Sequence, residues 1–134
     1  FSNHLYQLDE IHAFEIKVYA GHLYGTGFIY GLRKTPYTEA INYIKQDIIP
    51  ALFNISDMHH LKDNWHPFWQ SYKKNETDYH KLTALAAVDI AIWDLYLKHQ
   101  HISLHQYLGA AKANIAVYGT TGWLSFSLER LLEE

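Results

Sequence analysis

The chain has 134 residues, the length of a single domain, and 49% of them are hydrophobic, which excludes a chain that is disordered by composition. A formal net charge of −3 without a basic stripe argues against a nucleic-acid partner. The absence of cysteine excludes disulfides and thiolate metal sites and fits a cytoplasmic location, and no apolar run reaches the roughly 20 residues that cross a membrane.

The first third of the chain is expected to form an antiparallel hairpin. From Ile11 to Tyr19 apolar and polar residues alternate, as in a strand with one buried face. Gly21 lies in the expected turn, because glycine tolerates a positive φ angle, and residues 24–30 form the returning strand. The two glycines of that strand permit close approach of another backbone. Two strands alone are marginal, so we expect a third strand and place it before residue 1.

A helical signal follows the hairpin. Thr35 is a candidate N-cap, Pro36 suits the first helical position, and isoleucines spaced three and four residues apart indicate one buried face. Pro50 should end this helix near Ile48, because the residue before a proline avoids the helical conformation.

Two longer helices are expected after residue 55. Ser56 or Asp57 caps the first of them, and Pro67 should kink or split it. The second runs from Asp78 to about Gln100, and its stretch from 85 to 95 is apolar on every side except for two aspartates. A helix of that kind belongs in the interior of a protein.

The two aspartates in the apolar stretch are Asp89 and Asp94. A spacing of five residues places them about 140° apart around the helix, so they do not converge as an acid/base pair. Burying a bare carboxylate is costly. We therefore expect each carboxylate to be held by backbone donors or by a basic side chain.

The C-terminal part predicts a change of architecture. Ser103 caps a short helix that Gly109 ends, residues 115–118 form a buried strand, and Ser125 or Ser127 opens a final helix. The expected fold class is α+β, with an antiparallel hairpin or meander followed by a helical bundle and then a strand–helix unit that opens a (β/α) array.

These segments carry a resemblance to a known family. The motifs are A-V-D-I-A-I-W-D-L at 87–95, L-H-Q-Y-L-G at 104–109 and V-Y-G-T-T-G at 117–122. They resemble the junction between the N-terminal capping domain and the barrel in the mandelate racemase and muconate-lactonizing branch of the enolase superfamily. The hairpin sequence G-H-L-Y-G-T-G at 21–27 is similar to the family's D-G-L-x-G-x-G.

The resemblance implies a two-part enzyme that depends on Mg²⁺. Residues 1–109 are then its N-terminal capping domain, and residues 110–134 are the first β/α unit of a truncated (β/α) barrel. Its capping domain closes over a barrel whose acids bind the metal and whose base removes a proton next to the carboxylate of a small substrate. An acid-sugar dehydratase or a racemase/epimerase is the expected activity. This chain holds no K-x-K motif and no spaced series of acids, so by itself it is expected to bind no Mg²⁺ and to catalyse nothing.

The resemblance also implies where the substrate contacts lie. It maps two mobile loops of the family onto residues 1–9 and 30–36, and a barrel loop onto the segment after residue 118. The expected substrate-binding residues are His4, Tyr6, Tyr30, Arg33, Lys34, Thr120 and Thr121. A cation beside a tyrosine suits a carboxylated, hydroxylated ligand, and a solvated loop is the alternative for each of them.

Other interpretations stay open. The chain could be a free-standing capping-type interaction module or a pseudoenzyme subunit, or an unrelated α+β ligand-binding domain. His101 and His105 have the spacing of a metal-binding pair, but Ser103 should start a helix between them, so surface histidines are preferred. We also expect a homo-oligomer, because the last segment would expose an apolar stripe, made of Leu124, Phe126, Leu128, Leu131 and Leu132.

Overall fold

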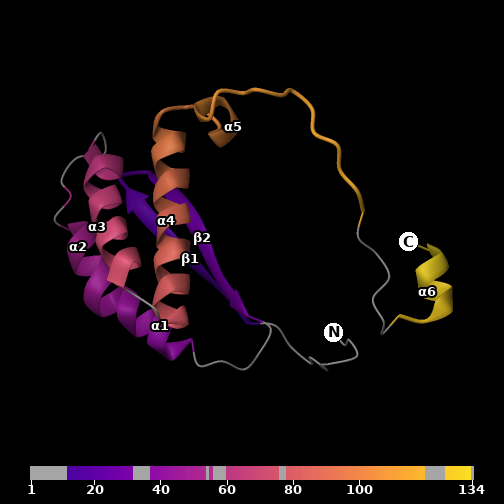
Figure 1. Cartoon of the computed structure of the whole chain (residues 1–134), viewed down its shortest axis with the longest axis horizontal. Coiled ribbons are helices and arrows are strands. Elements are labelled where there is room, and N and C mark those ends of the chain that lie inside the picture. The colour runs from indigo at the N-terminus through magenta and orange to yellow at the C-terminus, as the bar shows by residue number, and fades with distance from the viewer. Residues whose placement is uncertain are drawn as a thin grey trace.

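A computed structural model of the chain describes residues 12–31, 37–53, 55, 60–75, 78–119 and 126–133. Within these residues a two-stranded antiparallel sheet packs against a group of helices (Figure 1). The strands are β1 (His12–Ala20) and β2 (Leu23–Gly31). The helical elements are α1 (Thr38–Tyr43), η1 (Ile44–Ile48, one π-helical turn), α2 (Ile49–Phe53), α3 (Leu61–Asn75), α4 (Tyr79–His99), α5 (Leu104–Tyr107) and α6 (Leu128–Glu133). The α+β class is the one predicted.

The hairpin forms in the expected place. Gly21 takes a φ of 60° in the two-residue turn, and the register pairs His12 with Gly31 at the open end of the hairpin. Alternation along the strands puts one set of residues on the helices and the other in solvent. Ile29 on the helix side is 1% exposed, whereas its neighbour Tyr30 is 67% exposed.

The two glycines of β2 bring the sheet directly onto the backbone of α4. A β-carbon on Gly25 would collide with the carbonyl oxygen of Ala91, and one on Gly27 would collide with that of Ala87. Both alanines are at most 1% exposed. The close approach expected for these glycines is therefore confirmed, and small residues on both surfaces allow it.

The core lies between β2, α4 and the helices that precede α4. Its largest fully buried side chains, each at most 2% exposed, are Ile29, Ile48, Leu85, Val88, Ile92 and Leu95. Leu61 and Trp65 of α3 complete the cluster from the other side. Burying an aliphatic side chain of this size contributes about 1.5–3 kcal/mol to the stability of the folded state. Since α4 supplies four of the six side chains, it makes the largest contribution to the core.

Three predicted helix ends are confirmed by their hydrogen bonds. Asp78 accepts from the N–H of His80 at 2.8 Å and begins α4. Ser103 and Gln106 form a capping box at the start of α5, after which Gly109 takes a φ of 96°. Ser127, one of two candidates, accepts from the N–H of residue 130 at 3.2 Å and begins α6. The first helix was expected to begin at Pro36 after a cap at Thr35, but α1 begins at Thr38 with Tyr37 as its N-cap. Residues 35 and 36, the predicted caps at 56 and 57, and Ser125 lie outside the described residues.

The prediction for Pro50 was wrong, and one of the two alternatives for Pro67 is excluded. Pro50 does not end the first helix, because η1 leads directly into α2, and the N–H of Ile49 bonds to the carbonyl of Ile44, five residues earlier. A proline clashes with the carbonyl four residues before it in a regular α-helix, and the wider π turn relieves that clash. Pro67 was expected to kink or split its helix; it does not split α3, which runs without interruption from Leu61 to Asn75, and the kink stays a prediction.

The strand expected at residues 115–118 does not form. Ile115, Val117 and Tyr118 are 82–90% exposed, and the described sheet contains only β1 and β2. A strand exists only through hydrogen bonds to a neighbouring strand, and the described residues offer none to this segment. Among the described residues the strand of the expected β/α unit is therefore not formed, and the helix that follows this segment is α6. No helix among the described residues combines the length and the apolar character that a membrane crossing needs.

Candidate functional site

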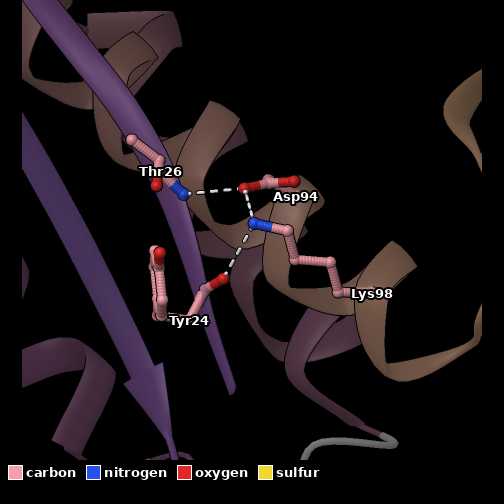
Figure 2. Close-up of polar contacts among 4 residues, drawn as sticks. All are labelled: Tyr24, Thr26, Asp94 and Lys98. Carbon is pink, nitrogen blue, oxygen red and sulfur yellow. Dashed lines mark hydrogen bonds and ion pairs between the residues drawn. The ribbon is translucent and has the colours of Figure 1, made fainter.

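Asp94 is the centre of a polar network that joins α4 to β2 (Figure 2). Its carboxylate oxygen Oδ2 accepts from the backbone N–H of Thr26 at 2.9 Å and from the Lys98 ammonium at 2.7 Å. The same ammonium donates to the carbonyl of Tyr24 at 3.1 Å and lies 5.1 Å from the centre of its ring. The predicted structural role of Asp94, held by a backbone donor and a basic side chain, is confirmed.

Asp89 points to a different neighbour. Its carboxylate accepts from the indole N–H of Trp65 on α3 at 2.8 Å. We had expected a backbone donor or a basic side chain, so the prediction for Asp89 was wrong. Partial burial raises the pKa of Asp89, and the bond from Trp65 and the nearby His66 act in the opposite direction. The two aspartates serve separate contacts and form no acid/base pair.

Lys17 adds a second cation beside the same tyrosine ring. Its ammonium lies 5.2 Å from the centre of the Tyr24 ring and 3.1 Å from the Glu15 carboxylate on the outer face of the sheet. The hydrogen bond to Glu15 and the negative charge of the Glu15 carboxylate raise the pKa of Lys17. These groups lie in solvent, and their arrangement favours a solvated surface rather than a catalytic centre.

The open end of the hairpin is the place from which both expected substrate loops depart. His12 and Gly31 are paired across the sheet, so residues 1–11 and 32–36 begin at adjacent points. Tyr37 packs against β1 at this end of the hairpin. Its hydroxyl donates to the carbonyl of His12 at 3.4 Å, and the centre of its ring lies 5.0 Å from the centre of the Phe14 ring. Tyr30 on β2 is paired with Ala13 and is largely exposed on the solvent side of the sheet.

Among the predicted substrate-binding residues, the structure places Tyr30 alone. Tyr30 lies within β2, one residue before its end, and not in the loop that was expected to begin at residue 30, and no described contact tests its role. The other candidates lie outside the described residues: His4, Tyr6, Arg33, Lys34, Thr120 and Thr121. Residues 110–119 leave the domain from α5, at the opposite end of α4 from the open end of the hairpin (Figure 1).

The described residues do not assemble a metal site. No group of three or more histidine, cysteine, aspartate or glutamate side chains within them could hold a metal ion. His101 lies in a turn with a φ of 55°, while His105 is on α5 and bonds to the carbonyl of Lys112 at 2.8 Å. The i, i+4 spacing of these two histidines therefore does not place them on one helix face.

Two partners of the aspartates on α4 were not predicted. Lys98 could have been found, because it follows Asp94 by four residues and such pairs meet on a helix surface. The contact between Trp65 and Asp89 joins two helices and had no local signal in the sequence.

Comparison with known proteins gives a family for most of the chain. Residues 14–109 match the model of the mandelate racemase / muconate lactonizing enzyme N-terminal domain. A D-mannonate dehydratase of Caulobacter sp. (strain K31) is 37% identical over 81 residues, which are 59% of this chain and 19% of that protein. A member of the D-galactonate dehydratase family from Marinomonas sp. (strain MWYL1) is 30% identical over 97 residues, 70% of this chain and 23% of that protein. The chain thus spans about a fifth of the length of these relatives. No solved structure matches the chain.

Proposed function

Because the chain belongs to the mandelate racemase / muconate lactonizing enzyme family, whose N-terminal domain it matches, we propose that it is the capping part of an acid-sugar dehydratase. The observation that carries the proposal is the family match over residues 14–109, joined by relatives that are named mannonate and galactonate dehydratases. A racemase or epimerase is the second activity in the same family. The substrate in either case is a small hydroxylated carboxylate.

The proposed contribution of this chain is substrate selection at the open end of the hairpin. Two segments start there side by side, because His12 and Gly31 are register partners. Arg33 and Lys34 supply cations for a carboxylate, and Tyr30, with His4 and Tyr6, supplies hydrogen bonds for hydroxyl groups. Thr120 and Thr121 would contribute from the barrel side.

Magnesium belongs, in this proposal, to the barrel and not to this chain. Mg²⁺ takes several oxygen ligands in nearly octahedral geometry, and the part of the chain that the structure describes does not fit it. The carboxylates of Asp89 and Asp94 are already held by Trp65 and by Thr26 with Lys98. No catalytic step is therefore derived from these residues.

A fusion protein tests the proposed activity. The full chain would be placed ahead of the part of the Caulobacter D-mannonate dehydratase that it does not match. We expect the fusion to remove water from D-mannonate or D-galactonate, detected as the keto acid product, and the chain alone to be inactive. A folded fusion that acts on neither acid would contradict the proposal and favour a non-catalytic interaction module.

Substitution of Tyr30 tests the proposed selection site in the same fusion. Tyr30→Ala should raise KM about fivefold, the effect of losing one hydrogen bond, with a smaller change in kcat. Tyr19→Ala is the matched control, because Tyr19 is 66% exposed and Tyr30 is 67% exposed, at opposite ends of the hairpin. Equal KM values for the two variants would show that Tyr30 does not contact the substrate.

A further inference from the structure

In the described sheet β2 is an edge strand, and its own sequence does not protect that edge. Its nine residues, LYGTGFIYG, include no charge and no proline, and its register with β1 runs without a bulge. Tyr24, Phe28 and Tyr30 on its solvent side are 43–67% exposed. Natural edge strands usually carry a charge, a proline or a bulge, which prevents pairing with another chain. Since β1 carries Glu15 and Lys17, β2 is the more vulnerable strand.

The direction of the backbone groups at the edge of β2 follows from the register of the hairpin. Along an antiparallel pair, hydrogen-bonded residue pairs alternate with pairs whose N–H and C=O groups point outward. In a hairpin with a two-residue turn, the pair that flanks the turn, here Ala20 and Leu23, is a bonded one. Tyr24 and Thr26 therefore belong to outward-pointing pairs, and their N–H and C=O groups are the ones to which an added strand would bond.

The ion pair of Asp94 and Lys98 makes the bonds of an added strand. In a parallel ladder, one residue of the new strand would donate to the C=O of Tyr24 and accept from the N–H of Thr26. Lys98 donates to that carbonyl at 3.1 Å, and Asp94 accepts from that N–H at 2.9 Å (Figure 2). A bond of 2.7 Å joins the two side chains to each other. The ion pair thus occupies the place of one strand residue.

The two charged side chains reach the edge of β2 from below the sheet. Their helix, α4, lies against the inner face of the strand at Gly25 and Gly27. The side chains of Asp94 and Lys98 are 36% and 44% exposed, so their bonds to the strand lie at the surface of the described domain. A strand that arrived at this edge would have to break these bonds and take both charges out of water, which is costly.

We propose that the ion pair of Asp94 and Lys98 closes the edge of β2 against pairing with β2 of a second copy of this chain. A second copy is the partner that suits this strand, because an antiparallel contact between two identical strands is self-complementary about a twofold axis. The uncharged sequence of β2 brings no like charges together in such a contact, and its exposed aromatic side chains would pair across it. The inference does not depend on the proposed function.

Removal of the ion pair tests the proposal. The opened variant carries Asp94→Ala and Lys98→Ala. The matched control carries Asp78→Ala and Lys81→Ala, which remove an acid and a lysine at the other end of the same helix. Both variants keep the net charge of −3, and the control also loses stability because Asp78 is the N-cap of α4. Circular dichroism shows whether each variant folds, and sedimentation velocity of the full chain at several concentrations measures association.

The opened variant should associate at least about tenfold more tightly than the unmodified chain, and the control should not. A folded opened variant with an unchanged association constant would overturn the proposal. Equal association of both variants would also overturn it, because lost stability and not the open edge would be the cause. Adding Phe28→Lys to the opened variant returns a charge to β2 and should abolish the gain. A gain that persists would lie on another surface and would overturn the choice of β2.

Hydrogen exchange in the unmodified chain tests the closed edge without any variant. The amide of Gly25 is held by the hairpin ladder, because Gly25 and its register partner Val18 form one of the bonded pairs. The amide of Thr26 should be protected to within about tenfold of it, since Asp94 holds that N–H. If the opened variant does not fold, this result decides: a protected Thr26 supports the proposal. A Thr26 amide that exchanges as fast as in an unstructured peptide, while Gly25 is protected, overturns it.

Discussion

Ile92 and Ile90 lie two residues apart on α4, yet Ile92 is 1% exposed and Ile90 is 55% exposed. The two side chains point about 160° away from each other, so Ile92 enters the core and Ile90 lies on an exposed side of α4. Their chemistry is identical, and both lie in the same apolar motif. The difference shows that hydrophobicity states which side chains favour burial, whereas the neighbouring elements decide which of them are buried within this domain.

Truncation of the two isoleucines should give the largest contrast. Ile92→Ala should lower the free energy of unfolding by about 3 kcal/mol, because it removes buried methyl groups and leaves a cavity in the core. Ile90→Ala should change it by no more than about 0.5 kcal/mol. Urea unfolding of the full chain, followed by circular dichroism, measures both. Equal losses would mean that Ile90 is covered in solution.

The contact between β2 and α4 can be broken by a single methyl group. Gly27→Ala should cost about 2 kcal/mol, because the new carbon meets the backbone carbonyl of Ala87, which cannot move without the helix. Gly119→Ala is the control, since nothing lies within 4 Å of a β-carbon there. The same urea experiment compares them, and a Gly27→Ala variant as stable as the control would show that the sheet lies farther from α4.

The polar link between α4 and β2 should contribute less than the packing. Asp94→Ala is expected to cost about 1–2 kcal/mol, because the N–H of Thr26 loses its acceptor in a partly buried position. Lys98→Met should cost less than about 1 kcal/mol, because it removes an ion pair that is largely in solvent. If the lysine variant proved the less stable of the two, the ion pair and not the backbone bond would be the stabilising contact.

Asp89 should show the smallest effect, and one that depends on pH. Its raised pKa means that the folded chain binds the proton more tightly than the unfolded chain. The stability therefore falls as the pH rises from the ordinary pKa of an aspartate through the raised one. Asp89→Asn keeps an acceptor for Trp65 but carries no charge. The difference in unfolding free energy between this variant and the unmodified chain should therefore shift in favour of the variant as the pH rises through that range, and then become constant.

Unfolding in urea at several values between about pH 4 and pH 7 checks the prediction for Asp89. A stability difference between the variant and the unmodified chain that is the same at every pH would contradict it.

Much of the fold could be predicted because its signals are local. Gly21 in the turn and Asp78 and Ser103 at helix starts act through their own backbone neighbours, and each behaves as expected. Pro50 failed the same kind of rule, because a π turn before it changed the pattern of hydrogen bonds. The strand at 115–118 failed because its formation depends on a partner strand that the described residues do not supply.

The candidate site was predictable only in outline. The loop positions came from the resemblance, and the register of the hairpin adds that two of the loops begin side by side at His12 and Gly31. Tyr30 alone of the predicted substrate residues is described, and its role stays a prediction, as does the expected homo-oligomer.

The sequence by itself determined the order of the hairpin and the helices through α5, the caps of α4 and α5 and the family, because these depend on residues that are close together along the chain. Only the tertiary structure decided that the backbone of α4 lies against Gly25 and Gly27, and that Trp65 is the partner of Asp89. It also decided that Ile90 stays exposed while Ile92 is buried. These outcomes depend on which surfaces meet, and the apolar pattern of α4 is compatible with more than one such arrangement.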